Sequence, residues 1–254
     1  MHAVRLVAFD LDDTLAPSKS AIPPEMAAAL RALLRVAEVC VISGGQWLQF
    51  ETQVIAHLGA DDEEAARLHI MPTCGTRYLR HTSGNWENVY EHLLPDAVRT
   101  RVKTLLAREA RALGLWEDEV WGEVIEDRGS QITFSALGQR APLAEKRAWD
   151  PSGRKRIALT HALAPHLPDL EVRAGGSTSV DITPAGVDKA YGIRALSERT
   201  GIPLEEMVFV GDRLDPDGND YPVKALGVRC IETTGPEQTV GIIAALVAEI
   251  EGRA

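Results

Sequence analysis

The fold is decided by residues 4–15, whose sequence is VRLVAFDLDDTL. Its first half, Val4–Phe9, is almost entirely apolar, which is typical of a strand buried on both faces of a parallel sheet. Asp10 and Asp12 follow that strand at once. In open α/β sheets, chemistry gathers at the carboxyl ends of the strands. We therefore expect a parallel sheet with an acidic site at the end of this strand.

Three further segments share the apolar, β-branched pattern of a buried strand. They are Val39–Ile42, Met207–Val210 and Val228–Ile231. Helical patterns alternate with the strands along the chain. They cover Pro23–Glu38, Val187–Thr200 and the stretch after Pro236. This alternation predicts an α/β fold built on a parallel sheet.

The middle of the chain has a different pattern. Two segments alternate apolar and polar residues, as half-buried antiparallel strands do: Glu123–Ala136 and Glu171–Thr183. Two others have helical patterns: Pro95–Leu113 and Arg154–Leu163. Far more residues separate Ser43 from Lys189 than one crossover between strands needs. We therefore expect an inserted α+β domain over residues 82–186, with residues 1–81 and 187–254 forming the core domain.

Composition limits the classes of partner. The 254 residues suit one to two domains, and the formal net charge is −10. Such an acidic surface repels phosphate backbones and anionic lipid, so we expect no nucleic acid and no membrane as partners. The three cysteines lie far apart, which argues against a disulfide framework or a zinc ribbon. The first residues, MHAVRL, lack a signal-peptide pattern, and we expect a cytoplasmic protein.

The first acidic stretch contains Asp10 and Asp12 in the turn after the strand, where both carboxylates can face the same space. Two carboxylates this close repel each other unless a cation or a proton lies between them. Mg2+ prefers carboxylate oxygens and keeps water molecules that a phosphate can replace. A carboxylate can also attack phosphorus and form an acyl phosphate. The alternative is an Asp-rich turn and helix cap without chemistry.

A second acidic stretch, GDRLDPDGND, covers residues 211–220. Its Asp212 and Asp220 would add oxygen ligands to the same ion. A calcium-binding loop of the EF-hand type is excluded, because Asp220 stands where that loop needs glycine and Leu226 stands where it needs Glu. A solvated turn rich in Asp, Gly and Pro is the other interpretation.

Two weaker signals accompany these carboxylates. Ser43 and Gly44 begin a turn after a strand, where a hydroxyl and free backbone N–H groups can hold phosphate oxygens. Lys189 begins a helical segment and would offset charge between carboxylates and a phosphate. Each signal is weak alone, because Ser-Gly-Gly is a common turn and most lysines are solvated.

Together these stretches resemble the four motifs of the haloacid dehalogenase (HAD) superfamily. The motifs are Asp10-Leu11-Asp12-Asp13-Thr14, then Ser43, then Lys189, and then Gly211-Asp212 with Asn219-Asp220. The resemblance implies a Rossmann-like parallel-sheet core with an inserted α+β cap of the C2B type, as in subgroup IIB. It also implies that Asp10 is the nucleophile that becomes phosphorylated and that Asp12 is the general acid/base.

The same resemblance implies the remaining core ligands. Ser43 and Lys189 would hold the phosphoryl group. Mg2+ would be bound by Asp10, the backbone carbonyl of Asp12 and Asp212, with Asp220 near or on the ion. The cofactor that the resemblance implies is therefore Mg2+.

The inserted part is similar to eukaryotic-type phosphomannomutases. Residues 175–181, GGSTSVD, and residues 184–189, PAGVDK, resemble that family's GGxxSxD and PxGxDK segments. Arg140 and Arg147 stand seven residues apart, as two of its phosphate-binding arginines do. By this resemblance Arg140, Arg147 and Ser179 would bind the substrate's distal phosphate, and Asp181 a sugar hydroxyl. Lys19, which stands where the family usually has an arginine, and Gly44 complete the substrate-binding residues. The family's caps also pair, which implies a homodimer.

The sequence thus predicts Mg2+-dependent phosphoryl transfer through an aspartyl phosphate, on a small phosphorylated sugar or related metabolite. A sugar-phosphate phosphatase is favoured, because Ser135 stands where the family has a third arginine and the cap strand after Phe134 looks shorter. The first alternative is a phosphomannomutase that interconverts mannose 1-phosphate and mannose 6-phosphate. The second is a non-catalytic regulator that binds Mg2+ or a phosphorylated ligand. Arg140 and Arg147 can equally be read as solvated surface charge.

Overall fold

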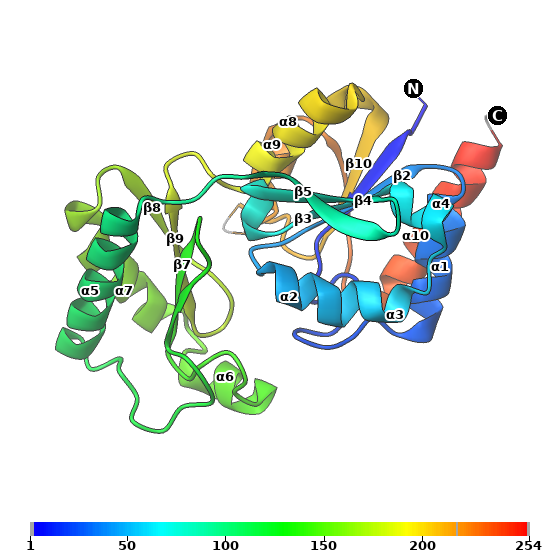
Figure 1. Ribbon diagram of the computed structural model, residues 1–254. Helices are drawn as coiled ribbons and strands as arrows, with labels where there is room; N and C mark the ends of the chain where they lie inside the picture. The colour runs from blue at the N-terminus through cyan, green and yellow to red at the C-terminus, as the bar shows by residue number, and fades with distance from the viewer. Residues whose placement is uncertain (1–2, 217, 253–254) are drawn as a thin grey trace. The chain divides into compact units, whose positions relative to one another are not determined.

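The computed structural model describes residues 3–216 and 218–252 (Figure 1). The chain divides into two compact units. The first combines Met1–Glu91 with Asp188–Ala254, and the second is His92–Val187. Among the described residues, none of the helices combines the length and apolar character that crossing a membrane requires.

The first unit is built on a seven-stranded sheet with the order β11-β10-β1-β2-β3-β4-β5. Its five parallel strands are β11 (Arg229–Glu232), β10 (Met207–Gly211), β1 (Leu6–Phe9), β2 (Glu38–Ile42) and β3 (Leu68–Met71). The antiparallel hairpin of β4 (Arg77–Thr82) and β5 (Asn85–Glu91) completes one edge. The α/β class with a mostly parallel sheet, predicted from the apolar runs, is confirmed.

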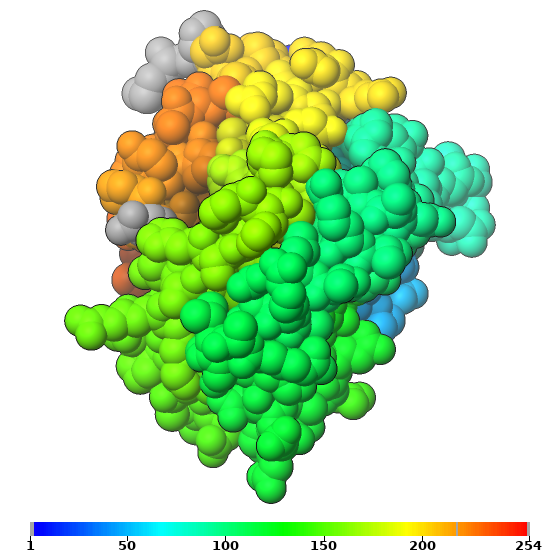
Figure 2. All heavy atoms as spheres, turned by 90° about the vertical axis from the view of Figure 1, so that its left-hand side faces the viewer, coloured from blue at the N-terminus to red at the C-terminus, as the bar shows by residue number. Residues whose placement is uncertain are grey.

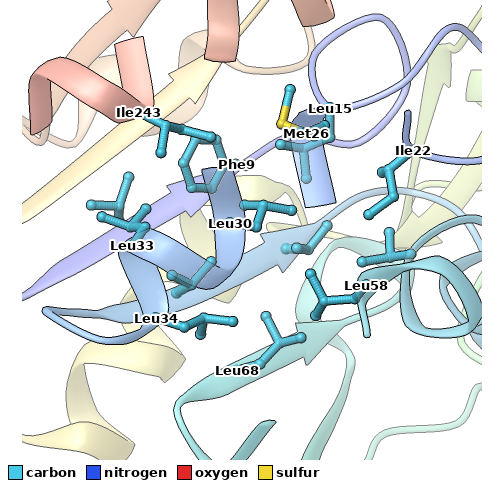
Figure 3. Close-up of a cluster of buried hydrophobic side chains, with 14 of the residues drawn as sticks. Phe9, Leu15, Ile22, Met26, Leu30, Leu33, Leu34, Leu58, Leu68 and Ile243 are labelled. Carbon is cyan, nitrogen blue, oxygen red and sulfur yellow. The ribbon is translucent and has the colours of Figure 1, made fainter. Parts of the chain in front are cut away.

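Helices cover both faces of this sheet, which is why its central strands are apolar throughout. Val7 and Phe9 pack with α1 (Pro24–Leu34) and α10 (Pro236–Glu251), as Figure 3 shows for Phe9, Leu33 and Ile243. The alternate residues, Leu6 and Ala8, pack on the opposite face with α8 (Lys189–Thr200) and α9 (Tyr221–Ala225). The remaining helical segments are α2 (Trp47–Phe50), a π-helix (Glu51–Ile55), α3 (Ala56–Leu58), α4 (Asp62–Ala66) and 3-10 turns at Thr73–Gly75 and Leu204–Glu206.

The second unit, green to yellow-green in Figures 1 and 2, is built on a four-stranded antiparallel sheet. Its order is β6 (Ile125–Asp127), β7 (Ile132–Ser135), β9 (Ser179–Pro184) and β8 (Leu170–Ala174). Phe134 and Val180 face the helices α5 (Asp96–Ala112) and α7 (Arg154–Leu163). On the other face, Thr133 pairs with Asp181 and Ser135 with Ser179. Also in this unit are α6 (Leu143–Trp149) and a 3-10 turn at Ala164–His166. One face of the sheet is therefore apolar and the other polar.

Two boundaries differ from the expectations. The first helix ends at Leu34 and not at Glu38, because the Glu38 backbone N–H joins the sheet by donating to the Arg5 carbonyl at 2.9 Å. The second unit begins at His92 and not at residue 82, because β5 pairs with β4 in the sheet of the first unit. Polar, turn-rich sequence in this hairpin hides it from the pattern of a buried strand.

The apolar layer between α1 and the sheet generates a stability prediction. Leu33 is fully buried there, so Leu33→Ala should lower the free energy of unfolding by about 2–5 kcal/mol through lost contacts and a cavity. Urea unfolding followed by circular dichroism measures this. The matched control is Leu48→Ala, because Leu48 is 57% exposed and its truncation should cost less than about 0.5 kcal/mol. Equal losses in the two variants would contradict this packing.

Candidate active site

The ends of three neighbouring parallel strands bring the predicted core residues together. Asp10 follows β1, Ser43 follows β2 and Asp212 follows β10. Phe9 lies in register with Val41 on one side and Val210 on the other, so these ends are level. The Asp10 backbone N–H donates to the Val210 carbonyl at 3.0 Å.

Lys189 joins this edge from the first position of α8, which is N-capped by Asp188. Its Nζ donates to Asp10 Oδ1 and to Asp220 Oδ1, each at 2.5 Å. The Lys189 side chain is only 1% exposed. A buried ammonium therefore links the end of β1 to the loop that follows β10.

Asp220 reaches this position because the end of β10 lacks a side chain. A Cβ at Gly211 would lie 2.3 Å from Asp220 Oδ2, so only glycine leaves room for the carboxylate. Asp220 is fully buried, and its Oδ2 accepts from the Arg213 backbone N–H at 3.2 Å. The acidic stretch after β10 is thus folded back onto the strand that precedes it and is more than a solvated turn.

Asp10, Asp212 and Asp220 each offer a carboxylate oxygen, and these oxygens lie within 4.8 Å of one another. Burial raises the pKa of Asp10 to about 7; attraction to Lys189 opposes this rise, and repulsion from Asp220 and Asp212 adds to it. Burial and repulsion from Asp220 raise the pKa of Asp212 to about 6. One ammonium leaves these three carboxylates with excess negative charge. An all-oxygen donor set of this charge fits a hard divalent cation.

Asp12 has different partners. Its Oδ1 accepts from the Lys19 backbone N–H at 2.9 Å, and its Oδ2 lies 2.9 Å from Lys19 Nζ. Gln49 Nε2 also donates to Asp12 Oδ2, at 3.0 Å. Burial alone would raise the pKa of Asp12, but Lys19 and Gln49 together hold it below its ordinary value. The two aspartates of the first motif thus lie in opposite electrostatic environments.

Ser43 is buried, and its Oγ accepts from the Gly45 backbone N–H at 3.2 Å. The Ser43 carbonyl accepts from the Cys74 backbone N–H at 2.9 Å. The turn containing Gly44 is therefore held by its own hydroxyl and by the loop after β3. This fixes a hydroxyl and backbone N–H groups at the end of β2, beside the end of β1.

In the second unit, Ser179 and Asp181 stand on the polar face of β9. Asp181 Oδ1 accepts from Thr133 Oγ1 at 2.7 Å and from Gln131 Nε2 at 2.9 Å. Arg140 and Arg147 are both exposed, Arg147 on α6 and Arg140 in the segment before it. The structure therefore places Ser179 and Asp181 on one face, whereas the two arginines lie on other segments of the unit.

Three polar contacts at these sites were not predicted from the sequence. In the first, Thr14 Oγ1 donates to Asp10 Oδ2 at 3.4 Å; Thr14 is the last residue of the first motif, but no role was predicted for it. Gln49 contacts Asp12, and Gln131 contacts Asp181. Neither glutamine has a motif or spacing that distinguishes it from an ordinary polar residue.

Residues 89–249 match the family model described as "Eukaryotic phosphomannomutase". The chain belongs to this family. Human phosphomannomutase 1 is 26% identical over 227 residues, covering 87% of this chain and 83% of the relative. Phosphomannomutase from Saccharomyces cerevisiae is 26% identical over 253 residues, covering 95% and 93% of the two chains. The resemblance to phosphomannomutases predicted from the motifs is confirmed.

Solved structures support the same fold. IMP-nucleotidase from Plasmodium falciparum aligns with a TM-score of 0.73 and 14% identity, covering 96% of this chain and 70% of that one. A haloacid dehalogenase-like hydrolase from Bacteroides thetaiotaomicron aligns with a TM-score of 0.65 and 17% identity, covering 96% and 99%. This member of the phosphomannomutase family is therefore an enzyme of the HAD superfamily, either a phosphatase or a phosphotransferase.

The raised pKa values of this phosphomannomutase-family site predict how stability depends on pH. Asp10 and Asp212 have pKa values of about 7 and about 6, above their ordinary value of 3.8, so the folded chain keeps protons that the unfolded chain has lost. When EDTA removes divalent cations, the contribution of these two carboxyl groups to the free energy of unfolding should fall as the pH rises from about 4 to about 8. A divalent cation should restore more stability at the upper end of this range than at the lower end.

Urea unfolding at several pH values, with EDTA or with MgCl2, measures this dependence. Asp212→Asn should flatten the fall in EDTA and weaken the stabilisation by Mg2+. Glu63→Gln, a change of an exposed carboxylate on α4, is the control and should leave both unaltered. An unchanged pH slope in Asp212→Asn would show that this carboxylate is not held in its raised state.

Proposed function

We propose that the chain catalyses Mg2+-dependent phosphoryl transfer through an aspartyl phosphate on Asp10, with a small sugar phosphate as donor and water as the final acceptor. The observation that carries the proposal is the meeting of Asp10, Lys189, Asp212 and Asp220 at one strand end. Membership of the phosphomannomutase family supports the same chemistry. A non-catalytic regulator has no comparable support. Residues 92–187 would act as the cap.

In the first step an oxygen of Asp10 attacks phosphorus while the bond to the sugar oxygen breaks. Lys189 holds the other Asp10 oxygen, so the attacking carboxylate is fixed in orientation. The Ser43 hydroxyl and the Gly44 backbone would bind phosphoryl oxygens, since both lie in the turn after β2. Asp12 delivers a proton to the departing sugar oxygen from its protonated form, which its lowered pKa makes the minor form at neutral pH.

In the second step Asp12, now ionised, accepts a proton from water, and the water oxygen attacks phosphorus and releases Asp10. Lys19 and Gln49 favour the ionised form of Asp12, which suits this base step. Asp10, Asp212, Asp220 and the Asp12 carbonyl would hold Mg2+. When bound, Mg2+ would neutralise charge on the transferred group.

The polar face of the cap sheet favours a sugar over a second phosphate. The Asp181 carboxylate accepts from the Thr133 hydroxyl. Arg173, which lies opposite Asp181 on β8, forms an ion pair with Glu171 at 2.6 Å. Ser135, which stands where the family has a third arginine, accepts from Gln139 Nε2 at 2.7 Å. Hydroxyls and carboxylates bind sugar hydroxyls well, whereas a bisphosphate held at both ends needs concentrated positive charge.

The second candidate is a phosphomannomutase, in which a second sugar hydroxyl replaces water as the acceptor. The match to the family model favours a mutase, as does the large share of each phosphomannomutase chain that aligns with this one. Arg140 and Arg147 would then bind the distal phosphate with Ser179, and Lys19 would complete the substrate site. A homodimer through the cap and a cytoplasmic location remain predictions from the sequence.

The nucleophile is tested by Asp10→Asn. This change removes the attacking charge but keeps the shape, so turnover and the aspartyl phosphate that borohydride would reduce to homoserine at position 10 should both disappear. Glu63→Gln, which removes an exposed carboxylate on α4, is the control for loss of a negative charge. It should change turnover by less than about two- to threefold, as expected of a surface substitution. Normal turnover in Asp10→Asn would refute the assignment.

The two outcomes are separated by supplying mannose 1-phosphate and glucose 1-phosphate, each with and without the matching hexose 1,6-bisphosphate. A phosphatase releases inorganic phosphate in both cases, and we expect this result. Accumulation of the 6-phosphate isomer, dependent on the bisphosphate, would establish the mutase. Arg147→Ala should then raise KM for the hexose phosphates and spare a small aryl phosphate.

A further inference from the structure

Gln49 closes a ring with the ion pair of Asp12 and Lys19. Its amide Nε2 donates to Asp12 Oδ2 at 3.0 Å, while its Oε1 accepts from Lys19 Nζ at 2.7 Å. Lys19 Nζ in turn lies 2.9 Å from Asp12 Oδ2. A side-chain amide is suited to this place, because it donates to a carboxylate and accepts from an ammonium at the same time.

The amide is oriented from behind by Gln53. Gln49 Nε2 also donates to Gln53 Oε1 at 3.1 Å, and Gln53 is buried. The backbone carbonyl of Gln53 accepts from the Ile22 N–H at 2.8 Å, which ties the helix to the loop that follows Lys19. Gln53 lies in the π-helix that continues α2, and such π-helical turns occur often at functional sites.

Gly45 leaves the space that the amide occupies. A Cβ at Gly45 would lie 2.1 Å from Gln49 Oε1, and the three nearest atoms all belong to the Gln49 side chain. A methyl group there would therefore displace the amide, which is the first group it meets. The glycine turn after β2 serves the Asp12 carboxylate as well as any phosphate.

We propose that Gln49 is a positioning residue for Asp12. The inference rests on the proposed role of Asp12 as general acid/base. The Lys19 backbone N–H holds Asp12 Oδ1, but at Oδ2 the Lys19 ammonium is a flexible point charge. The Gln49 amide adds a directed hydrogen bond at Oδ2, and proton transfer depends steeply on such geometry. The side-chain hydrogen bonds of Gln49 are with Asp12, Lys19 and Gln53, so it would act on the reaction through Asp12.

The test compares two phosphate esters in the full-length enzyme with Mg2+. The sugar hydroxyl of mannose 1-phosphate leaves poorly and needs a proton, whereas para-nitrophenolate leaves without one. The rate compared here and below is that of leaving-group release in the first turnover, because the later attack of water depends on Asp12 with either ester. Gln49→Ala should lower this rate on mannose 1-phosphate by roughly tenfold, the effect of losing one hydrogen bond to a charged group, with substrate affinity unchanged. It should change the first-turnover burst of para-nitrophenolate much less.

Two comparisons show whether Gln49 acts through Asp12. Asp12→Ala should give the same preference for the good leaving group with a larger loss, and the double variant Asp12→Ala/Gln49→Ala should be no slower than Asp12→Ala alone. Gly45→Ala should reproduce Gln49→Ala by displacing the amide, and should add nothing in the Gln49→Ala background. Gln46→Ala, an exposed glutamine before the same helix, is the matched control.

The outcomes are distinguishable. If Asp12→Ala discriminates between the esters but Gln49→Ala slows both equally, or if the two losses multiply, Gln49 does not act through Asp12 and this inference alone fails. If Asp12→Ala slows both esters equally, the proposed function of Asp12 fails and the inference fails with it.

Discussion

The first unit is organised around one buried positive charge, the Lys189 ammonium between Asp10 and Asp220. Burying such ions costs several kcal/mol each, and mutual attraction offsets this only with close contact. That requirement fixes the start of α8 against the ends of β1 and β10. It also demands glycine at the end of β10, where a side chain would displace the Asp220 carboxylate.

The convergence of these charges could be predicted from the sequence because it follows from topology. Apolar runs identify β1, β2, β10 and β11, and a parallel sheet brings their carboxyl ends to one edge. Strands β3, β4 and β5 were not predicted from the sequence, and the reason is physical. Strand β3 contains the buried His69, which is paired to Glu38 and Tyr78, and the hairpin strands are partly polar. A residue that is buried through its partners leaves no apolar pattern.

The position of Gln49 could not be predicted, because it depends on how a loop turns back. Asp13 and Lys19 both have positive φ angles, 61° and 59°, and these bends return the chain so that Lys19 meets Asp12. Such conformations cost energy for residues other than glycine and persist only where surrounding contacts enforce them. The contact between Gln131 and Asp181 is likewise made across strands, without any local signal.

Asp10 and Asp12 are chemically identical and two positions apart, yet their surroundings divide them. Burial and two neighbouring carboxylates raise the pKa of Asp10, even though Lys189 opposes them. An ammonium and an amide lower the pKa of Asp12. A site that pushes the pKa values of two like groups apart can give them different chemical tasks. The lowered pKa of Asp12 matches its proposed role as the base of the second step, whereas Asp10 lies in a carboxylate cluster where a bound cation would favour its ionised, nucleophilic form.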